Sequence, residues 1–125
     1  MFILSLFLTA QLVPQSLLDR ADAANLAYTQ CLFAVSRESS EAGFSTNQFG
    51  RKLEGACLAE GRSLIQVSTK IFTLRGEPNA AVQAERLDRD ARRGMIEDYT
   101  RMIELEPQLE RLAEVCRTQP HACRE

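Results

Sequence analysis

Residues 16–76 read SLLDRADAANLAYTQCLFAVSRESSEAGFSTNQFGRKLEGACLAEGRSLIQVSTKIFTLRG and contain two apolar stripes on either side of a polar segment around Gly43. The positions of the first stripe are Leu17, Ala21, Ala24, Tyr28, Cys31 and Val35. The positions of the second stripe are Leu53, Cys57, Glu60, Leu64, Val67 and Ile71. Both stripes advance by three and four residues, which is the spacing of one helix face. The segment therefore predicts two amphipathic helices.

The two stripes are mirror images of each other. When they are paired from the loop outward, the two residue numbers of every pair add up to 88, as in 35 with 53 and 17 with 71. An antiparallel helical hairpin that turns near residue 44 produces such a rule. The hairpin would place Cys31 opposite Cys57 and Tyr28 opposite Glu60. This register is a prediction that the position of each pair can test.

Capping signals and breakers predict the helix ends. The first helix should run over 17–37, and the second should begin at Ser45, which forms a capping box with Gln48, and continue to Gly76. A third helix should cover 79–105, because Pro107 disfavours the helical conformation of the residue before it. A short fourth helix should cover 108–117. We therefore predict an all-α fold, an antiparallel three-helix bundle built on the hairpin with a short C-terminal helix.

Composition places the chain among ordinary globular proteins. It has 125 residues, of which 45% are hydrophobic, so residues 16–125 are expected to form a single helical domain. The 15 basic and 17 acidic residues leave a net charge of −2. Such a balance lacks the positive field of a nucleic-acid binder, so nucleic acid is not an expected partner.

Residues 1–15 are expected to be a leader and a short linker. The apolar run MFILSLFLTAQLV is too short to cross a bilayer comfortably and has the length of the apolar core of a secretory signal. A cut after Ala10 is preferred over one after Ala23, which would remove part of the first stripe. No Lys or Arg precedes the run, so a buried first element of an intracellular protein is the alternative. We expect a periplasmic or secreted protein, with a cytoplasmic one as the alternative, and membrane contact only through an uncleaved leader.

Four cysteines fit an exported chain with two disulfides. The mirror rule selects Cys31–Cys57, which leaves Cys116–Cys123. The alternative is that the thiols are reduced, and then Cys116, His121 and Cys123 could hold a soft metal such as zinc or copper(I). Their spacing matches no usual zinc site, so no metal is the main expectation and this cluster is the alternative.

Two further groups of charged residues invite a functional interpretation. Glu60 is the one charged residue of the stripes, and we expect it to form a buried polar pair with Tyr28 that fixes the register rather than to catalyse a reaction. Residues 85–93, ERLDRDARR, place opposite charges four residues apart, which is typical of a solvated helix face. A basic docking patch would carry fewer interleaved acids.

The function expected from these features is binding without catalysis. The only His lies in the tail, and no motif for phosphate, dinucleotide or metalloprotease chemistry is present, so neither an enzyme nor a cofactor is expected. The partner would be a protein or a component of the cell envelope, and a homodimer is one form of such an assembly. An exposed apolar patch is expected on one side of the second helix, at Phe44, Phe49, Phe72 and Leu74. A metal or ligand carrier is the alternative function.

Overall fold

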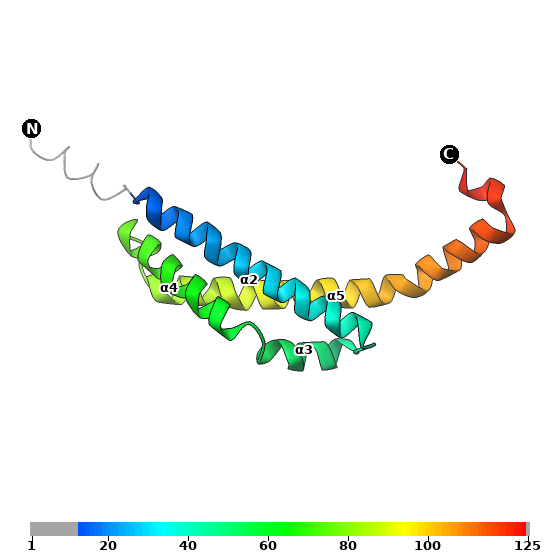
Figure 1. The fold of residues 1–125 in the computed structure, drawn as a ribbon, viewed down its shortest axis with the longest axis horizontal. Coiled ribbons are helices and arrows are strands. Elements are labelled where there is room, and N and C mark those ends of the chain that lie inside the picture. The colour runs from blue at the N-terminus through cyan, green and yellow to red at the C-terminus, as the bar shows by residue number, and fades with distance from the viewer. Residues whose placement is uncertain (1–12, 125) are drawn as a thin grey trace, which may run out of the picture.

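The computed structural model describes residues 13–124, and every regular element in that range is helical. The predicted leader therefore lies almost entirely outside the described residues. Figure 1 shows α2, α4 and the first half of α5 lying side by side, with α3 at one end and the second half of α5 extending away. The elements are α2 Gln15–Glu41, α3 Thr46–Glu54, α4 Leu58–Leu74, α5 Ala80–Thr118 and the 3-10 helix η1 Pro120–Cys123.

The first helix, α2, is longer at both ends than the sequence predicts. The Pro14 carbonyl accepts hydrogen bonds from the backbone N–H groups of Leu17 and Leu18, so the helix begins directly after the proline. At the other end the serine-rich segment stays helical, and Ser39 is completely buried. The chain leaves the helix only at Gly43, whose φ of 71° is a conformation that glycine adopts without steric cost.

The predicted second helix is divided into α3 and α4, which corrects the prediction of one continuous helix. The capping box at its start is present, since the Ser45 Oγ accepts from the Gln48 backbone N–H at 3.2 Å and the Gln48 Oε1 accepts from the Ser45 N–H at 2.8 Å. The helix then ends at Gly55. Cys57 adopts a left-handed φ of 57° and precedes the first turn of α4. Apolar spacing continues across the break, and for that reason the sequence pattern did not reveal it.

The predicted third and fourth helices are joined into one, α5. Pro107 lies inside it, and a proline there removes one backbone hydrogen bond to the carbonyl of Ile103. Ile103 is the last residue of α5 that packs against the core, and the residues of α5 after it are exposed except for Cys116. Water can therefore reach the freed carbonyl, and the helix continues. We call residues 104–118 the arm, and the rest of the described chain the head.

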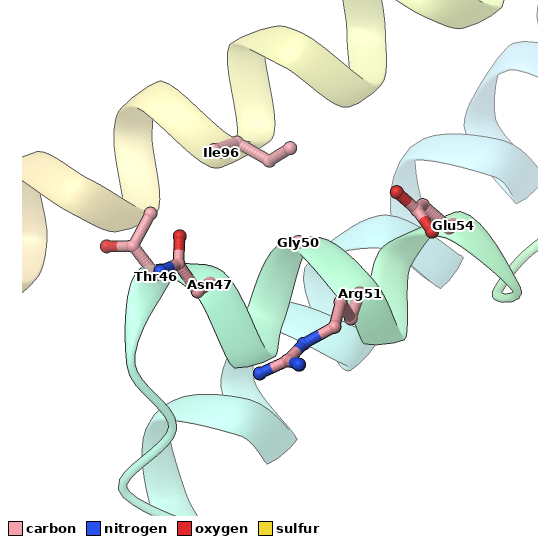
Figure 2. A pocket seen from close by; sticks show the side chains of 6 residues that line it. All are labelled: Thr46, Asn47, Gly50, Arg51, Glu54 and Ile96. Atoms are coloured by element: carbon pink, nitrogen blue, oxygen red, sulfur yellow. The ribbon is translucent and has the colours of Figure 1, made fainter.

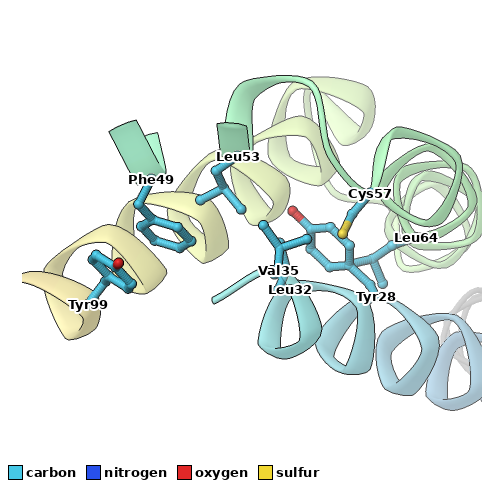
Figure 3. Packing of buried hydrophobic residues seen from close by; sticks show 8 residues of the cluster. All are labelled: Tyr28, Leu32, Val35, Phe49, Leu53, Cys57, Leu64 and Tyr99. Carbon is cyan, nitrogen blue, oxygen red and sulfur yellow. The ribbon is translucent and has the colours of Figure 1, made fainter. Parts of the chain in front are cut away.

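The core joins α2, α3, α4 and the first half of α5. Its largest buried cluster comprises Tyr28, Leu32, Val35, Phe49, Leu53, Cys57, Leu64 and Tyr99 (Figure 3). The rings of Phe49 and Tyr99 stack with their centroids 4.2 Å apart. A second cluster joins Leu17 near the start of α2 to Val67 and Ile71 near the end of α4, so these two helices run in opposite directions. Both clusters contain residues that the mirror rule pairs.

The apolar patch predicted on the second helix is not an exposed surface. Phe49 is completely buried, and Phe44 packs against the main cluster. Phe72 is half-buried, and of the four residues only Leu74 is exposed. The prediction was wrong because Phe44, just before α3, and Phe49, within it, face α5, and the Tyr99 hydroxyl donates to the Phe44 carbonyl at 2.7 Å. Within residues 13–124, no helix is both long and apolar enough to cross a membrane.

Candidate functional site

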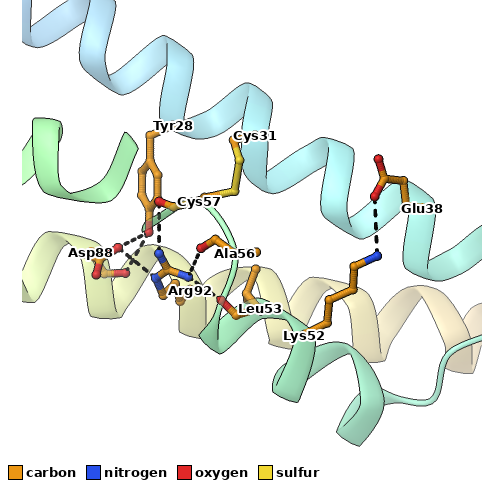
Figure 4. Close-up of a disulfide and its surroundings, with 9 residues drawn as sticks. All are labelled: Tyr28, Cys31, Glu38, Lys52, Leu53, Ala56, Cys57, Asp88 and Arg92. Atoms are coloured by element: carbon orange, nitrogen blue, oxygen red, sulfur yellow. Dashed lines mark hydrogen bonds and ion pairs between the residues drawn. A yellow bond between two sulfur atoms is a disulfide. The ribbon is translucent and has the colours of Figure 1, made fainter. Parts of the chain in front are cut away.

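A polar centre lies inside the head where α2, α4 and α5 meet. The hydroxyl of Tyr28, a residue that is only 1% exposed, donates a hydrogen bond to the carboxylate of Asp88. Arg92 lies one turn further along α5, and its Nε donates to the Asp88 Oδ1 at 3.0 Å (Figure 4). Burial and the hydrogen bond to Asp88 raise the pKa of Tyr28 far above its ordinary value, so the phenol stays neutral at physiological pH.

Arg92 also satisfies the backbone at the break between α3 and α4. The last carbonyls of a helix have no partner within it. The guanidinium Nη1 donates to the carbonyls of Leu53 and Ala56, the second at 2.8 Å, and Nη2 lies 3.4 Å from the Cys57 carbonyl. A cation at a helix C-terminus is also favoured by the helix dipole. One side chain of α5 thus donates to three carbonyls at the break, of which those of Leu53 and Cys57 also accept from backbone N–H groups.

The predicted pair of Tyr28 with Glu60 is not formed, because Asp88 takes the tyrosine hydroxyl. The two residues come from opposite helices as expected, but Glu60 is half-buried and its carboxylate turns toward the sulfur atoms of Cys31 and Cys57, with all three potential ligand atoms within 4.8 Å of one another. The prediction considered only two helices and omitted the third. After burial, the hydrogen bond to Asp88 is the next largest cause that raises the pKa of Tyr28.

The charged segment 85–93 is not a uniformly solvated face. Asp88 and Arg92 form the expected pair four residues apart, but their side chains are only 22% and 16% exposed. The sequence contains a signal for this, because Ala84, Asp88, Arg92, Met95 and Tyr99 follow one another at steps of four, four, three and four. These positions share one face of α5, and the buried Ala84 and Tyr99 lie on it. The two charges could have been assigned to the interior from that spacing.

The disulfide between Cys31 and Cys57 joins α2 to the break, with 5.9 Å between the two Cα atoms (Figure 4). This is the pair that the mirror rule selects. Glu60 and the two sulfurs resemble a three-ligand group, but a disulfide offers no thiolate, which is the form that binds metal. In this state the centre is a covalent crosslink with a carboxylate beside it.

The second disulfide closes a small loop at the tip of the arm. Cys116 and Cys123 are bonded with 5.6 Å between their Cα atoms. The loop that they close includes η1, in which His121 is exposed. Both sulfurs of the alternative metal cluster are thus occupied by each other. Only the imidazole of His121 remains as a ligand there, and one ligand does not hold a zinc or copper ion.

A surface hollow between α3 and α5 contains polar groups but no catalytic arrangement. It is lined by Thr46, Asn47, Gly50, Arg51, Glu54 and Ile96 (Figure 2). Arg51 projects from α3 on the side away from Ile96, and Glu54 lies near the far end of the helix, so the two charged groups do not converge on one point. A reaction would require a nucleophile or base held against a second polar group.

The arm presents the most unusual surface of the described chain. Its exposed apolar side chains, together with Met102 just before it, follow one another at steps of three and four and form what we call the α5 stripe: Met102, Leu105, Leu109, Leu112 and Val115. Leu109 at the centre is 61% exposed. Phe33 of α2 is equally exposed and lines one surface hollow together with Met102, so the apolar surface extends onto the head. Single exposed apolar residues are common, but a continuous row marks an interaction surface.

Comparison with known proteins gives no further assignment: no family model, curated protein or solved structure matches this chain. The geometry itself separates two kinds of feature. The polar centre and the first disulfide hold the head together, while the residues of the α5 stripe are exposed and belong to neither core cluster of the described chain. The stripe is therefore the candidate functional site.

Proposed function

We propose that this protein is a non-catalytic binding or assembly module that acts through the α5 stripe. In this proposal α2, α4 and the first half of α5 form an antiparallel three-helix bundle, and the arm carries the contact surface away from it. The observation that supports the proposal is the row of exposed leucines on the arm. Most of the stability of an amphipathic helix in water comes from the packing of its apolar face against other groups.

The polar groups of the head support a structural role rather than a chemical one. Tyr28, Asp88 and Arg92 satisfy one another and the carbonyls of the break, so none is left to act on a substrate. The raised pKa of Tyr28 also keeps its phenol protonated, which disfavours it as a general base. These groups position the arm by fixing α5 in the head.

We further propose that the module works in an oxidising compartment, in the periplasm or outside the cell. Two disulfides are compatible with such a compartment, because cytosolic thiols are usually kept reduced. The apolar run at the N-terminus supports export. The partner would be a protein of the same compartment, or a component of the envelope.

A site-specific photo-crosslinking amino acid tests the role of the stripe in cells. We would place it at Leu109, in the centre of the stripe, and at the neighbouring Glu110, which is about 100° away around the helix axis and outside the stripe. Crosslinked adducts at position 109 and their absence at 110 are expected. Adducts at neither position, or equal adducts at both, would contradict a contact surface on this face.

A further inference from the structure

The α5 stripe has the spacing of a coiled-coil seam. Met102, Leu105, Leu109 and Leu112 are separated by three, four and three residues, and Cys116 follows after four more. In the heptad notation abcdefg, positions 102 and 109 are a, and positions 105 and 112 are d. Apolar residues at a and d form the seam of helices that supercoil around each other. The arm thus carries a short seam of about two heptads.

The other positions of the arm agree with this assignment. Residues at b, c and f face away from a coiled-coil partner, and in the arm they include Glu104, Glu110, Arg111 and Glu114. Pro107 is at position f. Its ring is thus on the side opposite the seam and does not obstruct a partner helix. A charged outer face and an apolar inner one are what a two-stranded coiled coil requires.

The residues that flank the seam indicate which partner fits. Arg101 occupies a g position and Glu106 the following e position. In a parallel dimer of identical helices, the g residue of one chain lies beside the next e residue of the other, so Arg101 would meet Glu106 of a second copy, twice by symmetry. In an antiparallel dimer Glu106 would face Glu106, which is repulsive. The charges therefore complement a second copy in parallel orientation.

The ion pair that Arg101 forms within the single chain does not prevent it from pairing with a second copy. The Arg101 guanidinium contacts Asp98 at 2.8 Å, but both side chains are mostly exposed, at 67% and 70%. Exposed pairs of this kind contribute little and can exchange partners. Phe33 lies beside Met102 at the start of the seam and would be covered by the same contact.

We propose that the α5 stripe binds the α5 stripe of a second copy of this chain, as a parallel two-stranded coiled coil. The proposal rests on the proposed function, because it names the partner of the same surface. Two heptads are fewer than the three or four of a strong coiled coil. The dimer is therefore expected to be reversible and to dissociate on dilution.

Sedimentation equilibrium of the oxidised full chain, from micromolar to millimolar concentration, tests the association. Wild type is expected to change from monomer to dimer. Leu109→Glu, which would bury a charge in the seam, is expected to weaken dimerisation by at least about tenfold. Leu74→Glu is the matched control, since Leu74 is exposed at the end of α4 and should leave the dimer unchanged. A wild type that stays monomeric at millimolar concentration, or a trimer, overturns the proposal.

Charge reversal tests the orientation and the identity of the partner. Arg101→Glu and Glu106→Arg should each weaken the homodimer about three- to tenfold, because each places like charges opposite each other. An equimolar mixture of the two variants should form heterodimers with wild-type strength, since every contact is then of opposite sign. An antiparallel dimer predicts instead that Glu106→Gln strengthens association and Arg101→Glu has no effect. Either of those results overturns the parallel assignment.

The two levels of the proposal fail in different ways. If the protein remains monomeric in solution while position 109 crosslinks to a different protein in cells, the second-copy inference is wrong and the proposed function stands. If neither experiment shows contact at the α5 stripe, both are wrong. Crosslinking at position 109 between two copies of this chain supports both.

Discussion

Replacing Arg92 by methionine should cost the protein a large part of its stability. The guanidinium is bonded to the Asp88 carboxylate and to carbonyls of Leu53, Ala56 and Cys57. Methionine keeps much of the volume but no donor, so the carboxylate is left half-buried without its cation. Breaking a buried ion pair in this way costs about 3–5 kcal/mol. Because the two side chains are 16% and 22% exposed, we expect the lower end, about 3 kcal/mol.

Urea unfolding followed by tyrosine fluorescence measures this loss. The only tyrosines of the chain are Tyr28 and Tyr99, and both are buried in the core, so the signal reports on the head and not on the arm. Arg93→Met is the control, because the neighbouring Arg93 is exposed and should change the unfolding free energy by less than about 0.5 kcal/mol. A second series with Asp88→Asn should show coupling, with the double variant less destabilised than the sum of the single ones.

Two results would refute this reasoning. A cost below about 1 kcal/mol for Arg92→Met would mean that water replaces the guanidinium at the break without penalty. Strict additivity of the Arg92 and Asp88 substitutions would mean that the two side chains do not act on each other. The stability of the break between α3 and α4 would then need another explanation.

Three further measurements test other parts of the structure. Replacing Cys31 and Cys57 by serine opens a loop with a sequence separation of 26 and should lower the unfolding free energy by about 3.5 kcal/mol, whereas removing the disulfide of the arm should leave the tyrosine-monitored transition in place. Tyr28 has a raised pKa in the folded state, so the stability that its neutral form contributes is complete below pH about 10 and is lost as the pH rises further. Unfolding free energies measured across this range should therefore fall less steeply with pH for Tyr28→Phe than for wild type. An unchanged slope would exclude Tyr28 as the cause of the pH dependence. Gly61→Ala would place a Cβ 3.1 Å from the Asp88 Oδ1 and should lower the melting temperature. Gly94→Ala is the control, because nothing lies within 4 Å of its Cβ position, and it should raise the unfolding free energy by up to about 1 kcal/mol. Equal effects at both sites would show that the polar centre tolerates the methyl group.

Much of the helical pairing was predictable because it depends on spacing. The steps of three and four in residues 16–76 selected Cys31 and Cys57 as partners, and the structure joins them. The helix ends were less predictable. Apolar spacing runs through the break at 55–57 without a change of phase, and Arg92, which donates to the carbonyls there, lies 35 residues further along the chain than Cys57. Gly55, at which α3 ends, is a local signal, but it does not identify Arg92 as the side chain that contacts the break.

The candidate site was missed because the prediction assigned the wrong helices to the surface. Phe44 and Phe49 were expected to be exposed, since only α2 and α4 were available to cover them in the mirror rule. In the structure the ring of Tyr99 in α5 stacks on Phe49, and its hydroxyl donates a hydrogen bond to the Phe44 carbonyl. Leu109 and Leu112 of the arm were instead assigned to a short fourth helix, since Pro107 was expected to end the third helix. The helix continues through Pro107, because water can satisfy the carbonyl that the proline leaves without a donor.

The continuity of α5 has a thermodynamic consequence. One uninterrupted helix passes from a region anchored by Tyr99 and Arg92 to a region that belongs to neither core cluster, so its two halves open with different free energies. The arm is the half that gains most from a partner, since binding would supply the tertiary contacts it lacks. The loop between Cys116 and Cys123 restrains the open end of the helix and reduces the entropy lost when the arm is ordered. The crosslink at the tip therefore acts as preorganisation, and it does so at the place furthest from the core.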